Sequence, residues 1–250
     1  MPTRANITKF QFSDAIHRSY WDSRYQQEEF EVGPVTSAIA GGGSTGTEGD
    51  ENLLMTPKTC LQYHILGTQT ITAPVAVATG LDLGTMDQAT GDGIELNTGL
   101  LTSNPFSYRV GTDAAFFIRV RAAITTVAGT DDFAIGFRKM EANQALIDSY
   151  ADMAAINVIA GDIKTETIVG GAATVTTDTT DDWSDAESKV VEIQVSAAGV
   201  VSYSVDGSEP TTVVDYTFTD DLTLIPFIYF LQNGTQTVSL PITWECGFVS

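Results

Sequence analysis

Basic side chains are scarce in this chain. Only 12 lysines and arginines stand against 32 aspartates and glutamates, which gives a formal net charge of −20 at pH 7. Nucleic acid backbones and anionic membranes attract proteins through lysine and arginine, so this balance argues against both as partners. A strongly acidic surface suits a protein that stays soluble while it is displayed at high local density, and it suits equally well a cell or sea environment rich in salt.

Histidine and cysteine are equally few. The two histidines, His17 and His64, and the two cysteines, Cys60 and Cys246, show none of the short spacings that build zinc sites. Both cysteines lie in apolar stretches, so we expect buried thiols, although the sequence leaves open whether they pair. No apolar run has the length of a signal peptide or of a ~20-residue membrane helix, and we expect synthesis in the cytoplasm.

Catalytic patterns are missing as well. The chain has no Gly-x-Ser-x-Gly elbow, and the glycines at 41–43 lack the lysine and the preceding strand of a phosphate loop. Glycoside hydrolysis needs two carboxyls across the sugar, but we interpret Glu166, Glu192 and Glu245 as isolated acids on solvent-exposed strand faces. The sequence therefore predicts a protein that is not an enzyme and that holds no cofactor and no metal.

Strand-forming sequence is abundant. Large apolar side chains alternate with polar or small ones along 115–121, 133–138, 191–195, 201–205 and 242–248. Asp206-Gly207 follows one of these runs and has the composition of a hairpin turn. Many short strands separated by frequent turns predict an all-β fold, and specifically a jelly-roll β-sandwich.

Two stretches depart from simple alternation. Leu146, Tyr150 and Met153 fall at helical spacing, which predicts one short helix. Residues 224–230 are apolar on both faces, but Pro226 has no amide hydrogen to give to a strand ladder. We therefore expect Pro226 at a strand start, at a sheet edge or at a bulge.

A glycine-rich run at 41–51 divides the chain into two predicted parts. Residues 1–50 form an N-terminal docking arm and linker, and residues 51–250 form the sandwich. The arm is locally basic and aromatic, and arginine with aromatic side chains is typical of interface anchors. Its candidate docking residues are Phe10, Phe12, Arg18, Tyr20, Trp21, Arg24 and Tyr25. The alternative is that this segment is an outer strand and helix packed on the same core.

A second candidate site is an acidic, threonine-rich loop. Asp178, Asp181, Asp182 and Asp185 offer oxygen ligands of the kind that calcium prefers, although their spacing is not that of an EF-hand. Asp181, Asp182 and Trp183 form a possible ligand loop in which the indole stacks on a sugar. The alternatives are an acidic loop without an ion and a Trp183 that plugs one end of the core. We interpret the nearby Asp131-Asp132 as a turn.

Several motifs occur in a fixed order in the second half of the chain. They are Phe137–Ala142, Thr177–Trp183, Tyr203–Gly207, Pro226-Phe227 and Trp244–Gly247. As a set they resemble a family of structural proteins of tailed phages, including marine phages and cyanophages, over about residues 70–250. The resemblance implies a concanavalin A-like (LamG-like) jelly roll that carries no catalytic residues and lies on the capsid surface of the virion.

The same resemblance implies a function. It leads us to expect a capsid decoration or cement protein that binds the major capsid protein, stabilises the head and forms a homo-oligomer such as a trimer. The alternative is a glycan-binding, lectin-like module on the virion surface or tail that attaches the particle to host glycans.

Overall fold

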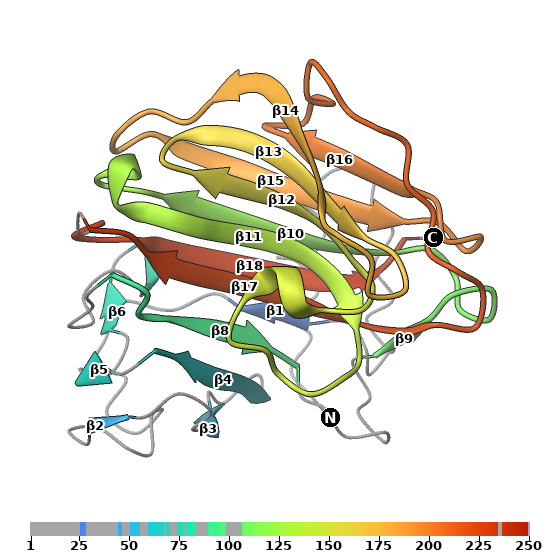
Figure 1. The fold of residues 1–250 in the computed structure, drawn as a ribbon, viewed down its shortest axis with the longest axis horizontal. Helices are drawn as coiled ribbons and strands as arrows, with labels where there is room; N and C mark the ends of the chain where they lie inside the picture. The colour runs from blue at the N-terminus through green and yellow to red at the C-terminus, as the bar shows by residue number, and fades with distance from the viewer. Residues whose placement is uncertain are drawn as a thin grey trace, which may run out of the picture.

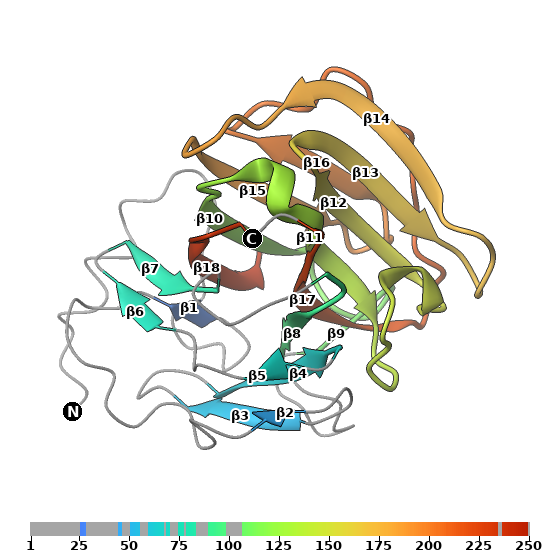
Figure 2. The same ribbon diagram turned by 60° about the vertical axis from the view of Figure 1, so that its left-hand side comes forward.

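The computed structural model describes residues 26–28, 45–46, 51–55, 60–67, 69–70, 75–77, 79–83, 90–98, 107–234 and 237–249. Within these residues the chain folds into two antiparallel sheets that pack face to face (Figures 1 and 2). The predicted all-β jelly-roll sandwich is confirmed. The only helical segments in the described part are two 3-10 turns, η1 (Val127–Gly129) and η2 (Ile147–Ser149).

Sheet A has the strand order β16-β15-β10-β18-β7-β6, and β1 also pairs with β18. Its strands are β1 (Gln26–Glu28), β6 (Val75–Val77), β7 (Gly80–Asp82), β10 (Phe116–Ala123), β15 (Ser188–Val195), β16 (Val201–Val205) and β18 (Pro241–Phe248). Strand β1 lies within the segment predicted to be an arm, and it is antiparallel to β18. This part of the segment therefore belongs to the sandwich.

Sheet B has the strand order β14-β13-β12-β11-β17-β8-β4-β3, and β9 also pairs with β17. Its strands are β3 (Glu51–Met55), β4 (Cys60–Leu66), β8 (Gly93–Asn97), β9 (Tyr108–Arg109), β11 (Thr130–Lys139), β12 (Met153–Ile159), β13 (Asp162–Ile168), β14 (Val175–Asp182) and β17 (Thr223–Gln232). A separate pair joins β2 (Thr45–Gly46) to β5 (Gln69–Thr70). Figure 2 shows β12, β13 and β14 curving along one side of the molecule.

The core lies between the two sheets, and it contains the side chains that the alternation predicted. Sheet B contributes Phe133, Ile135 and Phe137, and β18 contributes Ile242, Trp244, Cys246 and Phe248. Burial of each such side chain stabilises the fold by about 1.5–3 kcal/mol. Asp206 and Gly207 both have positive φ, 51° and 82°, and form a tight turn closed by the bridge between Val205 and Ser208, but no strand follows, so the predicted hairpin is reduced to this turn. Cys246 is a buried thiol, as expected, and the side chain of Cys60 lies outside the described residues.

The predicted helix through Leu146, Tyr150 and Met153 is wrong. Only Ile147–Ser149 forms a 3-10 turn, Tyr150 is already extended, and Met153 begins β12. Tyr150 and Met153 join Ile147 in a second apolar cluster on sheet B, on the face turned away from the core. Leu146 is 58% exposed and is not part of this cluster, so the three side chains at helical spacing do not share one buried face.

The predicted place of Pro226 is also wrong. It is the fourth residue of the ten-residue strand β17, opposite Phe137 of β11. On its other side β17 pairs with β9 up to Leu224 and with β8 only from Phe227. Pro226 thus stands where β17 changes partner, so its missing amide hydrogen costs no bond on that side.

Three glutamates that we interpreted as solvent-exposed are buried. Glu166, Glu192 and Glu245 are 4%, 9% and 8% exposed. On the outer face of sheet A, Arg119 forms ion pairs with both Glu192 and Glu245, the latter at 3.0 Å. A charged group is buried at low cost only when it is paired, and the cross-strand arginine supplies that pairing.

Candidate functional site on the outer face of sheet B

The outer face of sheet B, turned away from the core, carries polar side chains from β8, β11, β12, β13 and β14. At one end it is covered by the loop of residues 140–149, which Figure 1 shows crossing in front of the sheet. At the other end it is formed by β11, β12, β13 and β14, and it is rich in carboxylates. The two ends have different chemistry.

A buried ion pair holds the covered end together. Arg138 of β11 and Glu95 of β8 are both 0% exposed, and the Arg138 Nη2 lies 2.7 Å from the Glu95 Oε1. The Tyr150 hydroxyl donates a hydrogen bond to Glu95, and the Arg138 guanidinium lies 4.3 Å from the centre of the Tyr150 ring. Burial, followed by the negative charge of Glu95, raises the pKa of Tyr150. The hydroxyl therefore remains a donor across the physiological pH range.

The same arginine fixes the loop over the sheet. Its Nη1 donates to the carbonyls of Lys139 and Glu141 at 3.1 and 3.2 Å, and its Nη2 donates to the Asn143 Oδ1 at 2.7 Å. The Tyr229 hydroxyl adds a bond to the Ala145 carbonyl at 2.8 Å. With all these donors satisfied, the covered end is a closed structural network.

The open end carries carboxylates on three of its strands. Asp132 lies on β11, Asp162 and Glu166 lie on β13, and Asp178 and Asp182 lie on β14. We call these five side chains the acidic face. The register places Asp162 opposite Asp182, and Lys164 opposite Asp178, so all of these project from the same side of the sheet. Lys164 is the one base that the described register of β13 and β14 places among them, and its Nζ lies 3.7 Å from Asp162.

One amide links two of these carboxylates. The Asn157 Nδ2 donates to the Asp132 Oδ1 at 2.6 Å and to the Glu166 Oε2 at 3.0 Å. Asn157 is 0% exposed, and its Oδ1 has no hydrogen-bond partner among the described residues. A buried polar atom without a partner costs about 1–3 kcal/mol. The cluster of Asp132, Asn157 and Glu166 is therefore not fully satisfied by the described part of the chain.

Both carboxyls in this cluster hold a proton more tightly than usual. Burial, with smaller contributions from Glu166 and Asp131, raises the pKa of Asp132 from 3.8 to about 7. Burial also raises the pKa of Glu166, with Asp148 adding to the effect. Perturbed carboxyls of this kind gather at functional sites more often than elsewhere.

Sequence reasoning missed this cluster. We interpreted Asp131-Asp132 as a turn, but Asp132 lies inside β11, directly after a register shift between Thr130 and Asp132. That irregularity aims the Asp132 carboxylate at β12, where Asn157 stands between it and β13. The available signal was weak, because Asn157 lies in an otherwise apolar strand where a polar residue demands partners.

The three residues of the predicted ligand loop do not form one site in the structure. Trp183 is 2% exposed and belongs to the core, where its ring meets Phe133 edge to face and its Nε1 donates to the Glu187 carbonyl at 3.0 Å. An indole held there has no face to offer a sugar. Asp181 binds the backbone nitrogen and the hydroxyl of Thr211, both at 2.8 Å, whereas Asp182 belongs to the acidic face.

The calcium hypothesis finds no support in these side chains. The Asp178 carboxylate accepts from the Thr180 nitrogen and the Asp185 carboxylate from the Val127 nitrogen, so both serve as local backbone acceptors. In the described ranges, no three histidine, cysteine, aspartate or glutamate side chains come together in a way that would hold a metal ion.

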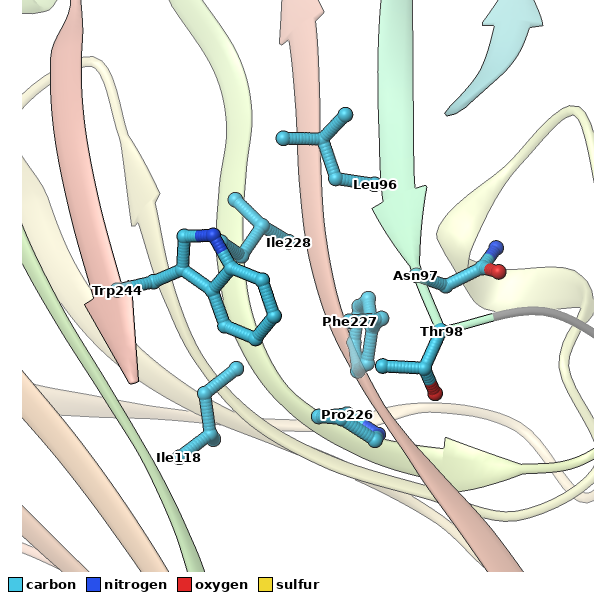
Figure 3. Close-up of a pocket in the computed structure, with 8 residues that line it drawn as sticks. All are labelled: Leu96, Asn97, Thr98, Ile118, Pro226, Phe227, Ile228 and Trp244. Atoms are coloured by element: carbon cyan, nitrogen blue, oxygen red, sulfur yellow. The ribbon is translucent and has the colours of Figure 1, made fainter. Parts of the chain in front are cut away.

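A cavity of about 10 Å³ lies between the sheets (Figure 3). Leu96, Ile118, Ile228 and Trp244 line it, and its remaining walls come from 97–98 and 226–227. It has room for about one water molecule, whereas ligand pockets usually measure about 300–1,000 Å³. This cavity is not a sugar site.

The predicted docking residues Phe10, Phe12, Arg18, Tyr20, Trp21, Arg24 and Tyr25 lie outside the described residues. The expected binding to a major capsid protein, the homo-oligomer and the place on a virion therefore stay predictions. In the part of the chain that the structure describes, no helix has both the length and the apolar character to cross a membrane.

Comparison with known proteins finds likeness of fold only. No family model matches the chain, and no curated protein matches it. A protein of unknown function from Shewanella oneidensis shares 12% identity over 100% of this chain and 95% of its own, with a TM-score of 0.48. The family 7 alginate lyase A1-II' shares 12% identity over 79% of this chain and 81% of its own, with a TM-score of 0.43. The Emp46p carbohydrate recognition domain shares 6% identity over 68% of this chain and 83% of its own, with a TM-score of 0.47.

Proposed function

We propose that the protein is a non-catalytic carbohydrate-binding sandwich whose binding surface is the acidic face of sheet B. The observation that carries the proposal is the cluster of Asp132, Asn157 and Glu166. Its two carboxyls are hydrogen-bond acceptors that β11 and β13 hold in fixed positions, and the Asn157 amide of β12 donates to both. Sugar hydroxyls are donors, and rigid acceptors bind them without the entropy cost of ordering flexible side chains.

The surroundings of the cluster suit a broad ligand. Thr176 lies opposite Glu166 in the register and donates to it at 3.3 Å. Asp162, Asp178 and Asp182 extend the surface toward the edge strand β14, and each is exposed. An extended oligosaccharide would lie across β11 to β14, with hydroxyls directed at carboxylates and at the threonine hydroxyl.

The geometry supports binding rather than cleavage. A glycosidase places two carboxyls on opposite sides of the scissile bond, about 5–9.5 Å apart, with the sugar between them. Here the space between Asp132 and Glu166 holds the Asn157 amide, which is hydrogen-bonded to both. Burial raises the pKa of both carboxyls, so their environments shift the two pKa values in the same direction and not in opposite directions.

Glu166→Gln tests this proposal. The substitution keeps the shape of the side chain but replaces one acceptor oxygen by a donor. A hydrogen bond to a charged acceptor contributes about 1.5–3 kcal/mol, so we expect the glycan dissociation constant to rise about 10- to 100-fold. The measurement is a glycan array followed by calorimetric titration of the ligands that bind.

Glu209→Gln is the matched control, because it removes one exposed acid from the loop after β16 in the other sheet. It should bind as the wild type does. If no glycan on the array binds the wild type, or if Glu166→Gln binds as tightly as Glu209→Gln, the acidic face is not a carbohydrate site. Release of shortened sugars from the titrated ligands would show cleavage instead.

A further inference from the structure

We infer that the ligand of the acidic face is a positively charged glycan, an oligomer of amino sugars with unacetylated amines. This inference rests on the proposed carbohydrate function and names its substrate class. It is carried by the imbalance between acceptors and donors on this face and by the unsatisfied amide at its centre.

The charge of the face points to a cation. Five carboxylates project from β11, β13 and β14, three of the four strands at this end of the sheet, and Asp148 lies close enough to influence both Asp132 and Glu166. Lys164 offsets only part of this charge, because its ammonium already pairs with Asp162 at 3.7 Å. Side chains of one sign on a low-dielectric wall concentrate ions of the other sign. An anionic polysaccharide, such as a polyuronate, would be repelled.

The buried amide adds a second, independent indication. Asn157 stands within the cluster, with both of its amide hydrogens given to Asp132 and Glu166. Its Oδ1 is a further acceptor without a partner in the described chain. The centre of the face therefore needs donors. An ammonium has three donor hydrogens and a positive charge, and it fits such a site better than a hydroxyl or an acetamide does.

Burial of the two central carboxyls strengthens the preference. A neutral sugar that covered Asp132 and Glu166 would remove water from them and further favour their protonated, uncharged forms. An ammonium would replace that water with an opposite charge. Burial is the main cause of the raised pKa of both carboxyls, and a nearby ammonium would lower both pKa values again.

The test is calorimetric titration of the full chain at about pH 6, where amino sugars are protonated and exposed carboxylates are ionised. The probes are a glucosamine hexamer, an N-acetylglucosamine hexamer, a uronate hexamer and a lysine hexamer. We expect the glucosamine hexamer to bind at least about tenfold more tightly than the acetylated hexamer, with an affinity that falls as salt is added. The uronate hexamer should not bind.

Two double variants locate the effect. Asp162→Asn/Asp178→Asn removes two charges from the acidic face, and Glu209→Gln/Asp215→Asn removes two exposed charges elsewhere. The first should weaken glucosamine binding about three- to tenfold, and the second should leave it unchanged.

Each other outcome overturns a different claim. Equal binding of the glucosamine and acetylated hexamers would contradict the charge preference and leave the proposed function standing. Equal binding of the lysine hexamer would show a general cation surface, with no selectivity for sugars. If both double variants lost glucosamine affinity equally, binding would depend on the net charge of the protein and not on the acidic face. If none of the sugars binds, both the inference and the proposed function fail.

Discussion

Arg138→Met is expected to lower the free energy of unfolding by about 3–5 kcal/mol. The substitution leaves Glu95 in a site that is 0% exposed, without the guanidinium that now lies 2.7 Å away. It also removes three bonds that hold the 140–149 loop over the sheet, to the carbonyls of Lys139 and Glu141 and to the Asn143 side chain. Urea unfolding at pH 7 measures the loss as a lower midpoint at an unchanged slope.

The partner variants separate the ion pair from the packing. Glu95→Gln alone should also be costly, because it leaves the Arg138 charge buried with too little compensation. In the double variant, Arg138→Met/Glu95→Gln, neither charge remains, and the loss should be smaller than the sum of the two single losses. Additive losses, or a loss below about 1 kcal/mol for Arg138→Met, would show that this pair does not hold the covered end together.

Asp132→Asn is expected to stabilise the protein at pH 8 and to leave its stability at pH 4 unchanged. The pKa of Asp132 is raised from 3.8 to about 7 in the folded state, so the folded protein binds this proton more tightly than the unfolded chain does. Stability is therefore lost as the pH rises from about 4 to about 7, and it is constant above that range. Asparagine has no proton to lose and can still accept the bond from Asn157.

The size of this effect follows from the shift. The rise in the pKa of Asp132 from 3.8 to about 7 corresponds to at most about 4 kcal/mol of unfolding free energy. Partial exposure of the side chain reduces this value, so we expect Asp132→Asn to raise the free energy of unfolding by about 1–3 kcal/mol at pH 8. Unfolding of wild type and variant between pH 4 and pH 8 measures the difference, in which the effect of the other carboxylates cancels. Parallel stability curves would show that Asp132 has an ordinary pKa.

The core was predictable because it depends on local alternation. Phe133, Ile135 and Phe137 face inward because side chains on a strand alternate between its faces, whatever the neighbouring strand is. The tight turn at Asp206-Gly207 was predictable for the same reason, since it is defined by adjacent residues, whereas the second strand expected after it is not formed. The expected burial of Trp183 as a core plug, one of two alternatives, followed from its size and its place between strands.

The site was not predictable because it depends on register. Asp132, Asn157 and Glu166 belong to three strands, and their meeting is set by how β11, β12 and β13 are aligned. A shift of one residue would turn each side chain to the opposite face, and no single stretch of sequence encodes that alignment. The bulge beside Asp132 adds an irregularity that alternation cannot reveal. Buried acids such as Glu166 were interpreted as exposed for the same reason.

The side-chain amide signals of Asn157 give the most direct test of the central claim, that the acidic face of sheet B binds carbohydrate. Their hydrogens bond to both Asp132 and Glu166, so any ligand that contacts this cluster must change them. In a nuclear magnetic resonance titration with the glucosamine hexamer, we predict that these signals shift together with the backbone amides of β13 and β14. Shifts confined to sheet A or to the loop at 183–187, with the Asn157 signals unchanged, would contradict the account.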